Sequence, residues 1–130
     1  MYYIYCNKHF PEGREQFTFS YHNGEAIVFG GLNTNKSNKV WRFDPLNLTW
    51  SILEFESQSI LNRIGHSAIL HQKKLFVFGG KSKIQSMYMF QDLEIFDVEQ
   101  KFWIFPNISS KHFLKLRRNH VALLIGRILL

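Results

Sequence analysis

The chain has 130 residues, of which 45% are hydrophobic and 16% aromatic, so it can build a folded core and is not a disordered segment. Phenylalanine dominates the aromatic share with 13 residues, and aromatic side chains favour strands over helices. The formal net charge of +6 is compatible with nucleic acid, an anionic membrane surface or an acidic protein as the partner, and does not choose among them.

The first clear strand signal along the chain is residues 26–29, a short apolar run that ends in Phe and is followed by Gly30-Gly31. A second strand is expected at residues 40–44, where an aromatic residue precedes Asp44. Asp44 and Pro45 predict a turn, because Asp accepts bonds from nearby backbone amides and Pro presets φ. Trp50 follows Asp44 by six residues, in a further strand-like segment.

The same order of features returns in residues 63–106. A second apolar run at 75–78 precedes Gly79-Gly80, which follows the first glycine pair by 49 residues (from 30 to 79). Alignment on the glycines places Arg14 over Arg63 and Phe17 over His66. Asp97 and Trp103 are again six residues apart. We therefore expect four strands in this copy, at about 66–71, 74–79, 92–97 and 102–106.

A third copy begins near the end of the chain. Residues 117–124 match residues 63–70 in outline, and His120 follows His66 by 54 residues. Continued without gaps, residues 128–130 lie over residues 74–76. The chain thus contains a unit of roughly 50 residues, present twice and begun a third time.

This unit resembles the kelch repeat: an Arg, a His-Ser-Ala segment at His66, a run ending in Gly-Gly, an aromatic-Asp strand end, and a Trp six residues later. The resemblance implies an all-β fold of four-stranded antiparallel propeller blades, with about two and a half blades and a ring that this chain alone does not close. It implies structural roles for the repeat positions, namely Gly30, Gly31, Trp50, His66, Gly79, Gly80, Asp97, Trp103 and His120.

The resemblance also divides the chain. Residues 14–54 form a first, degenerate repeat, in which Phe17 stands where the second copy has His66. Residues 63–106 form the second repeat, and 117–130 start a third, truncated one. Residues 1–13 are an N-terminal segment whose strand-like 2–5 suits the outer strand of a preceding blade. The abrupt stop within a strand favours a piece of a longer protein over self-association into a ring or an open stack.

No catalytic, metal or cofactor site is expected. The six histidines, at 9, 22, 66, 71, 112 and 120, include two at equivalent repeat positions, which favours a structural role over metal binding. The only cysteine, Cys6, excludes an internal disulfide and a site of several thiolates. Some kelch-type propellers are copper oxidases or sugar isomerases, yet no acid–base pair or nucleophile motif is recognised here, so we expect no enzyme.

A protein partner is the main functional expectation. The resemblance implies docking on the face that carries the loops between the second and third strands and between blades. Lysines in these loops predict a basic rim for an acidic partner, namely Lys36, Lys39, Lys81, Lys83, Lys111 and Lys115. The alternatives are solvated lysines with no partner, a fragment of a kelch-type propeller enzyme whose chemistry lies in other blades, or a nucleic-acid surface. The last is disfavoured because the aromatics fall at strand positions assigned to the core.

Location is expected to be cytoplasmic, with the nucleus as the alternative. One cysteine suits a reducing compartment. Residues 1–8 lack the basic and long apolar regions of a signal peptide. The longest apolar stretch, residues 121–130, is too short to span a membrane and is interrupted by Gly126-Arg127, so no membrane contact is expected.

Overall fold

The computed structural model describes residues 10–32, 39–53, 63–82, 93–106 and 119–122, and the strand residues 124–125 and 128–129. Every regular element in these ranges is a β-strand, which confirms the all-β prediction. No helix within these ranges is long and apolar enough to cross a membrane.

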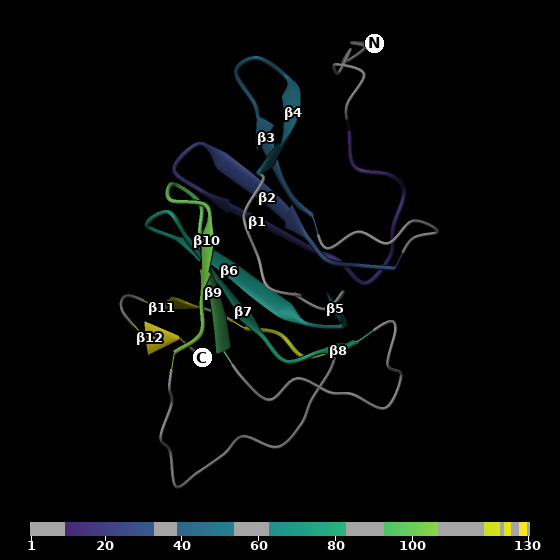
Figure 1. Cartoon of the computed structure of the whole chain (residues 1–130), viewed down its shortest axis with the longest axis vertical. Helices are drawn as coiled ribbons and strands as arrows, with labels where there is room; N and C mark the ends of the chain where they lie inside the picture. The colour runs from purple at the N-terminus through teal and green to yellow at the C-terminus, as the bar shows by residue number, and fades with distance from the viewer. Residues whose placement is uncertain are drawn as a thin grey trace, which may run out of the picture.

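The first four strands form one antiparallel sheet, called blade 1 here. Its members lie side by side in chain order: β1 (Thr18–His22), β2 (Glu25–Phe29), β3 (Val40–Asp44) and β4 (Thr49–Leu53) (Figure 1). Asn23 and Gly24, both with positive φ (47° and 82°), join β1 to β2 in a two-residue turn. Two positive φ values give this turn the twist that a hairpin needs.

The second sheet, blade 2, repeats this arrangement. It contains β6 (Ser67–His71), β7 (Lys74–Phe78), β9 (Leu93–Asp97) and β10 (Phe102–Ile104), again in the order of the chain (Figure 1). The four strands lie where the repeat predicts them, although β10 ends two residues before the expected end. Two antiparallel four-stranded sheets confirm the predicted blade architecture, and within the described ranges they do not close a ring.

Two short pairings complete the described structure. β5 (Arg63–Ile64) pairs with β8 (Lys81–Ser82), and the bridge between Glu15 and Leu32 is its counterpart in blade 1. β11 (Leu124–Ile125) pairs with β12 (Ile128–Leu129), with Ile125 opposite Ile128. This register matches that of His71 opposite Lys74 in blade 2, so the third repeat begins with the same hairpin.

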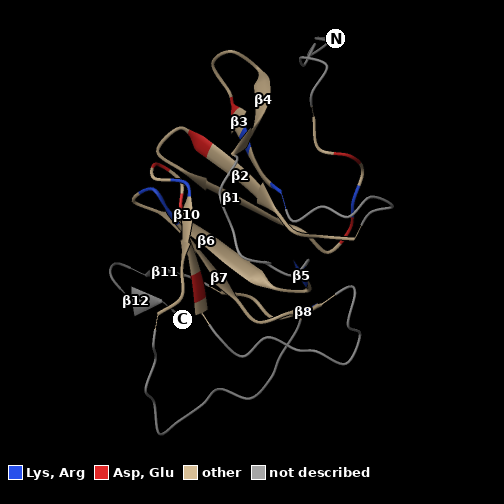
Figure 2. Cartoon of the chain, viewed as in Figure 1, with Lys and Arg blue, Asp and Glu red and all other residues tan. Residues whose placement is uncertain are grey.

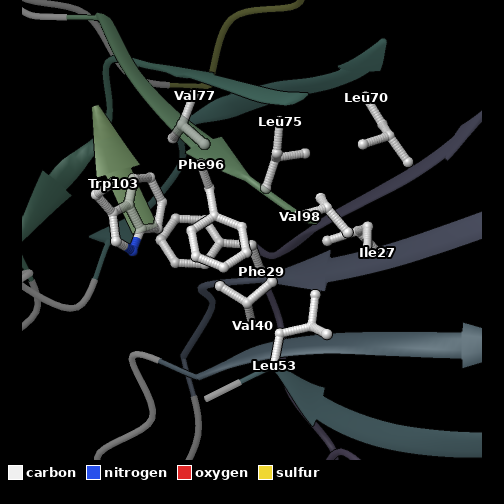
Figure 3. Close-up of a cluster of buried hydrophobic side chains, with 10 residues drawn as sticks. All are labelled: Ile27, Phe29, Val40, Leu53, Leu70, Leu75, Val77, Phe96, Val98 and Trp103. Atoms are coloured by element: carbon white, nitrogen blue, oxygen red, sulfur yellow. The ribbon is translucent and has the colours of Figure 1, made fainter. Parts of the chain in front are cut away.

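The hydrophobic core lies between the two blades. Figure 3 shows the rings of Phe29 and Phe96 side by side at its centre, with Trp103 against them. The centroid of the Trp103 ring lies 5.2 Å from that of Phe29 and 5.1 Å from that of Phe96. The cluster is completed by Ile27, Val40, Leu53, Leu70, Leu75, Val77 and Val98. Each blade thus buries one face against the other. Strand β2 is continuously apolar because Ala26 and Val28, on its other face, are buried as well.

The turns between the third and fourth strands are built by aspartates. Asp44 Oδ1 accepts hydrogen bonds from the amides of Leu46 (2.9 Å) and Asn47 (3.3 Å). Asp97 Oδ1 accepts equivalent bonds from the amides of Glu99 (3.0 Å) and Gln100 (2.8 Å). The hydrogen bond from the Asn47 side chain, followed by those from the amides, lowers the pKa of Asp44.

Candidate binding surface

One end of the two blades carries both glycine pairs, and we call it the Gly-Gly face. β2 ends there at Gly30-Gly31, and β7 ends there at Gly79-Gly80. Because the strands alternate in direction, β3 and β9 begin at this face and β4 ends at it. The connections from second to third strands and from blade 1 to blade 2 therefore start and end here. These are the connections in which the sequence predicts a partner site.

Two arginines at equivalent repeat positions hold the glycine pairs in place. Arg14 Nη1 donates to the Gly30 carbonyl, and Arg63 Nη1 donates to the Gly79 carbonyl, both over 3.1 Å. Arg63 is fully buried and forms an ion pair with Glu94 over 2.8 Å. Burial lowers the pKa of the partly covered Arg14. Both guanidinium groups serve the fold, so they add little to a surface for partners.

Gly30 allows blade 2 to approach blade 1 closely. Its φ is 69°, and a Cβ built on it would lie 2.4 Å from His66 Cε1 and 2.6 Å from the Arg63 carbonyl oxygen. No real Cβ accepts such contacts, because non-bonded carbon atoms are repelled well outside this distance. Gly31 also contacts the next blade, donating its amide to the Arg63 carbonyl over 3.0 Å.

Successive repeats are joined by a histidine and a hydroxyl, a pairing that we call the seam. His66 Nε2 lies 2.9 Å from Thr18 Oγ1, and His120 Nε2 lies 2.9 Å from Ser67 Oγ. The ring of His66 also meets that of Phe29 edge-on, with centroids 5.3 Å apart, and His120 meets Phe78 at the same separation. The contact between blade 2 and the third repeat thus copies the contact between blades 1 and 2.

His66 stays neutral at physiological pH. Burial, followed by the nearby charge of Arg63, lowers its pKa to about 3. A neutral imidazole can bond a hydroxyl without bringing a charge into the seam. This environment explains why a histidine at this repeat position is structural, as the sequence suggests, and ties its protonation to the contact between blades.

Backbone bonds repeat along the same seam. The Gly65 amide donates to the Gln16 carbonyl (3.3 Å), and the Asn119 amide donates to the Gly65 carbonyl (2.7 Å). All three residues occupy equivalent repeat positions and have positive φ values, of 57° for Gln16, 66° for Gly65 and 55° for Asn119. Three successive repeats therefore share one backbone conformation at the point where neighbours meet.

The structure describes two of the six predicted partner-binding lysines. Lys39 is exposed and directly precedes β3, and Lys81 is partly buried in β8, so both lie at the Gly-Gly face. Within the described ranges, neither takes part in an ion pair. The other four, Lys36, Lys83, Lys111 and Lys115, lie outside the described residues.

Acidic residues share this face with the two lysines. Glu15 is exposed and pairs with Leu32, next to Gly31, and exposed Glu12 lies close by in the segment held by Arg14 (Figure 2). The described part of the predicted rim therefore carries both positive and negative charges.

At the opposite end of the blades, three of the described cations lie in ion pairs, whereas exposed Lys101 takes part in none within the described ranges. Glu25 Oε2 contacts Lys73 Nζ across the two blades over 2.9 Å, and Glu25 Oε1 lies 3.7 Å from Arg42. Asp97 lies 3.6 Å from Lys74. His22 and His71, at equivalent positions, meet edge-on with centroids 5.0 Å apart. These partly exposed pairs contribute about 0–1 kcal/mol each and make this end less available to an acidic partner.

One surface was missed by the sequence interpretation. Phe17, Phe19 and Tyr21 are exposed by 43%, 58% and 63%, although the sequence assigned the aromatics to core positions. The assignment was wrong for these residues because they point away from blade 2, on the free face of β1. Their alternation at every second residue was the signal, since alternate residues of a strand share a face.

The described residues contain no group of three or more His, Cys, Asp or Glu side chains that could hold a metal ion. The histidines of the described ranges are instead taken up by neighbouring repeats, at the seam and in the His22–His71 pair.

Comparison with known proteins identifies the repeat. Residues 3–130 match the model of the KLHDC2/KLHL20/DRC7 Kelch-repeats domain. The chain is 33% identical over 126 residues to the Ras guanine nucleotide exchange factor F of Dictyostelium discoideum, a match that covers 92% of this chain and 11% of that protein.

Two further relatives match shorter stretches. The human Kelch domain-containing protein 3 is 31% identical over 75 residues, covering 55% of this chain and 20% of that protein. The N-acetylneuraminate epimerase of Shigella flexneri is 31% identical over 91 residues, covering 65% and 24%. The chain thus spans a quarter or less of the length of each of these relatives.

Proposed function

Because this chain belongs to the kelch-repeat family, we propose that it acts as a non-enzymatic protein-interaction module that presents its Gly-Gly face to an acidic protein partner. Kelch repeats generally mediate contacts between proteins. A repeat fold does not by itself fix a function, so the argument must come from the surface that the blades expose.

The position of Lys39 carries the proposal. It is exposed at the edge of the Gly-Gly face, beside the start of β3, and takes part in no ion pair within the described ranges. Lys81 lies at the same face, whereas Lys73, Lys74 and Arg42 at the other end already face carboxylates. A cation at the edge of a rigid blade can steer an acidic partner and form charge-assisted hydrogen bonds with it.

Charge reversal at matched positions tests this choice of face. Lys39→Glu changes the Gly-Gly face, and Lys101→Glu makes the same change in net charge on an exposed lysine at the opposite end. Both variants and the wild type would be used as baits in quantitative affinity purification from cells. We expect Lys39→Glu to lose reproducible protein partners that Lys101→Glu retains. Identical partner sets for all three baits would refute the proposed face.

Two other functions remain as alternatives. The likeness to the Shigella epimerase allows the chain to be part of a propeller enzyme whose chemistry lies in other blades. A nucleic-acid surface would show itself in fluorescence anisotropy as binding to single-stranded oligonucleotides that weakens steeply with salt. Such binding without any protein partner would replace the proposal. Because the single cysteine suits a reducing compartment, the proposal places the module in the cytoplasm or the nucleus.

A further inference from the structure

We propose that His22 and His71 together bind one transition-metal ion, with Zn²⁺ as the representative, at the junction of blades 1 and 2. The two imidazoles supply two ligands, and water fills the remaining coordination positions. This inference is independent of the proposed protein partner, because the pair lies at the end opposite the Gly-Gly face. It rests on the separation of the two rings, on their unused nitrogen atoms and on the paired strands that carry them.

Two neighbouring hairpins hold the pair in place. His22 is the last residue of β1 and His71 is the last residue of β6, and each directly precedes a two-residue turn (Figure 1). The two strands are bonded to each other nearby, because Ser20 Oγ donates to the Ala68 carbonyl over 3.0 Å. Both rings therefore extend from rigid elements, so they need little rearrangement to take up an ion between them.

The separation of the two rings is that of two imidazoles around one metal ion. Their centroids lie 5.0 Å apart, and their planes are inclined by 63°. Two imidazoles that share a tetrahedral Zn²⁺, with zinc–nitrogen distances of about 2.0–2.1 Å, have ring centroids about 5 Å apart. Because the rings meet edge-on and are not stacked, an ion can lie between their edges.

The ring nitrogens of this pair are available as ligands. His66 and His120 each use Nε2 in a seam, whereas neither His22 nor His71 forms a hydrogen bond within the described ranges. Both members of the pair are partly exposed, so an ion can reach them from solvent. A neutral imidazole with a free nitrogen is the commonest metal ligand in proteins.

The hairpin itself does not require histidine at this position. In the third repeat, the equivalent residue is Ile125, which lies opposite Ile128 in the register of His71 opposite Lys74. A residue needed to build the blade would recur there, as the seam histidine does. Two successive repeats with histidine at this position bring two imidazoles together at one junction.

The surroundings of the pair limit the site to two protein ligands. The carboxylate of Glu25 contacts Lys73 over 2.9 Å and Arg42 over 3.7 Å, and it offsets the positive charge that these cations bring to this end. Among the described residues, no third His, Cys, Asp or Glu completes a metal-binding group. Imidazole suits zinc, copper and nickel, whereas magnesium and calcium prefer oxygen. We therefore expect Zn²⁺ to bind and Mg²⁺ not to bind.

The first test is calorimetric titration of the untagged chain with zinc chloride. We expect one Zn²⁺ per chain and no heat of binding with magnesium chloride. Changes in the second shell of metal sites already weaken binding by about 10–100-fold, so loss of a ligand in His22→Gln or His71→Gln should weaken it by at least about tenfold. His9→Gln and His112→Gln make the same change elsewhere in the sequence and should leave binding intact. Absence of saturable binding, or equal weakening in all four variants, would overturn the proposal.

A second test uses the wild type and does not depend on the stability of any variant. Zinc should shift the imidazole nitrogen resonances of His22 and His71 in long-range proton–nitrogen spectra and leave those of the seam residue His66 in place. It should also raise the urea midpoint, because an ion bound only to the folded chain stabilises that state. Zinc binding that leaves the resonances of His22 and His71 unchanged would assign the ion to another site and overturn the proposal. The partner experiment with Lys39→Glu, run without zinc, tests the proposed function separately.

Discussion

At the scale of single residues, a histidine and a glycine set how closely blade 2 approaches blade 1, and the histidine contact recurs in the third repeat. His66 lies against Gly30 and bonds Thr18, and His120 bonds Ser67 in the same way. A histidine in this position must remain uncharged, and the residue that faces it must be glycine, because a Cβ would collide with the imidazole ring. Both requirements lead to measurable effects on stability.

Protonation of His66 should oppose folding in mild acid. Its pKa is about 3 in the folded chain and about 6.5 when unfolded, so only the unfolded state binds the proton between these values. The free energy of unfolding should therefore fall by up to about 1.4 kcal/mol per pH unit below pH 6.5, and level off near pH 3. Above pH 6.5 the residue is neutral in both states and has no effect.

Urea unfolding of the wild type and of His66→Gln at several pH values measures this effect. Carboxylates titrate in both proteins, so the difference between their pH profiles isolates His66. The variant should be less stable at pH 7, but its stability should depend less on pH between 6.5 and 4. Parallel profiles would show that His66 binds its proton equally well in the folded and unfolded states.

Gly30→Ala should destabilise the protein more than Gly24→Ala. Both glycines have positive φ, at 69° and 82°, so both variants carry a backbone cost of about 1–2 kcal/mol. A Cβ on Gly30 also collides with His66 and with the Arg63 carbonyl, whereas nothing lies within 4 Å of a Cβ on Gly24. We expect about 1–3 kcal/mol more loss for Gly30→Ala, measured as a lower urea midpoint. Equal losses would mean that blade 2 does not pack against Gly30.

At the scale of elements, the fourth strand of each blade shows how much a neighbouring blade adds to the burial of its tryptophan. Trp103 in β10 is 8% exposed because Phe29 of blade 1 covers it in addition to Phe96 of its own blade. Trp50 in β4 occupies the equivalent position and packs on Phe43, with centroids 4.9 Å apart, yet it is only half-buried. The same residue thus belongs to the core in one blade and to the surface in the other.

Trp103→Ala should therefore cost about 3–5 kcal/mol, the usual range for removing a buried Trp, and Trp50→Ala should cost clearly less. Chemical denaturation followed by far-ultraviolet circular dichroism would measure both, since that signal does not depend on the tryptophan removed. If the two substitutions cost the same, another part of the protein must cover Trp50 as blade 1 covers Trp103.

At the scale of the whole molecule, the sequence alone predicted the structural features that recur from repeat to repeat. The spacing of the glycine pairs and of His66 and His120 predicted the blades and the third repeat, because a repeated contact leaves a repeated residue. It could not predict the ion pair of Arg63 with Glu94, since blade 1 has Trp41 at the position of Glu94 and the pair does not recur. Nor could it tell that Phe19 and Tyr21 lack a covering blade, because alternation identifies a face and not its neighbour.

The predicted basic rim also shows that sequence spacing alone does not reveal which side chains lie together. Sequence spacing placed Lys39 and Lys81 in loops at one end of the blades. Both lie at that end, although Lys81 is in strand β8 and not in a loop. The spacing could not show that Glu12 and Glu15 share that end. Charge patterns along a chain do not determine which side chains meet in space. Whether the Gly-Gly face attracts an acidic partner therefore depends on individual cations such as Lys39.

The most direct test of the central claim, that successive repeats pack through the same seam, is a nuclear Overhauser experiment on the chain with labelled histidine and phenylalanine rings. The described geometry predicts cross-peaks between the rings of His66 and Phe29 and between those of His120 and Phe78, because each pair of centroids is 5.3 Å apart. Both cross-peaks together would establish three repeats stacked as blades. Absence of the His66–Phe29 cross-peak in the folded chain would contradict the packing of the two blades, and with it the surfaces assigned to them.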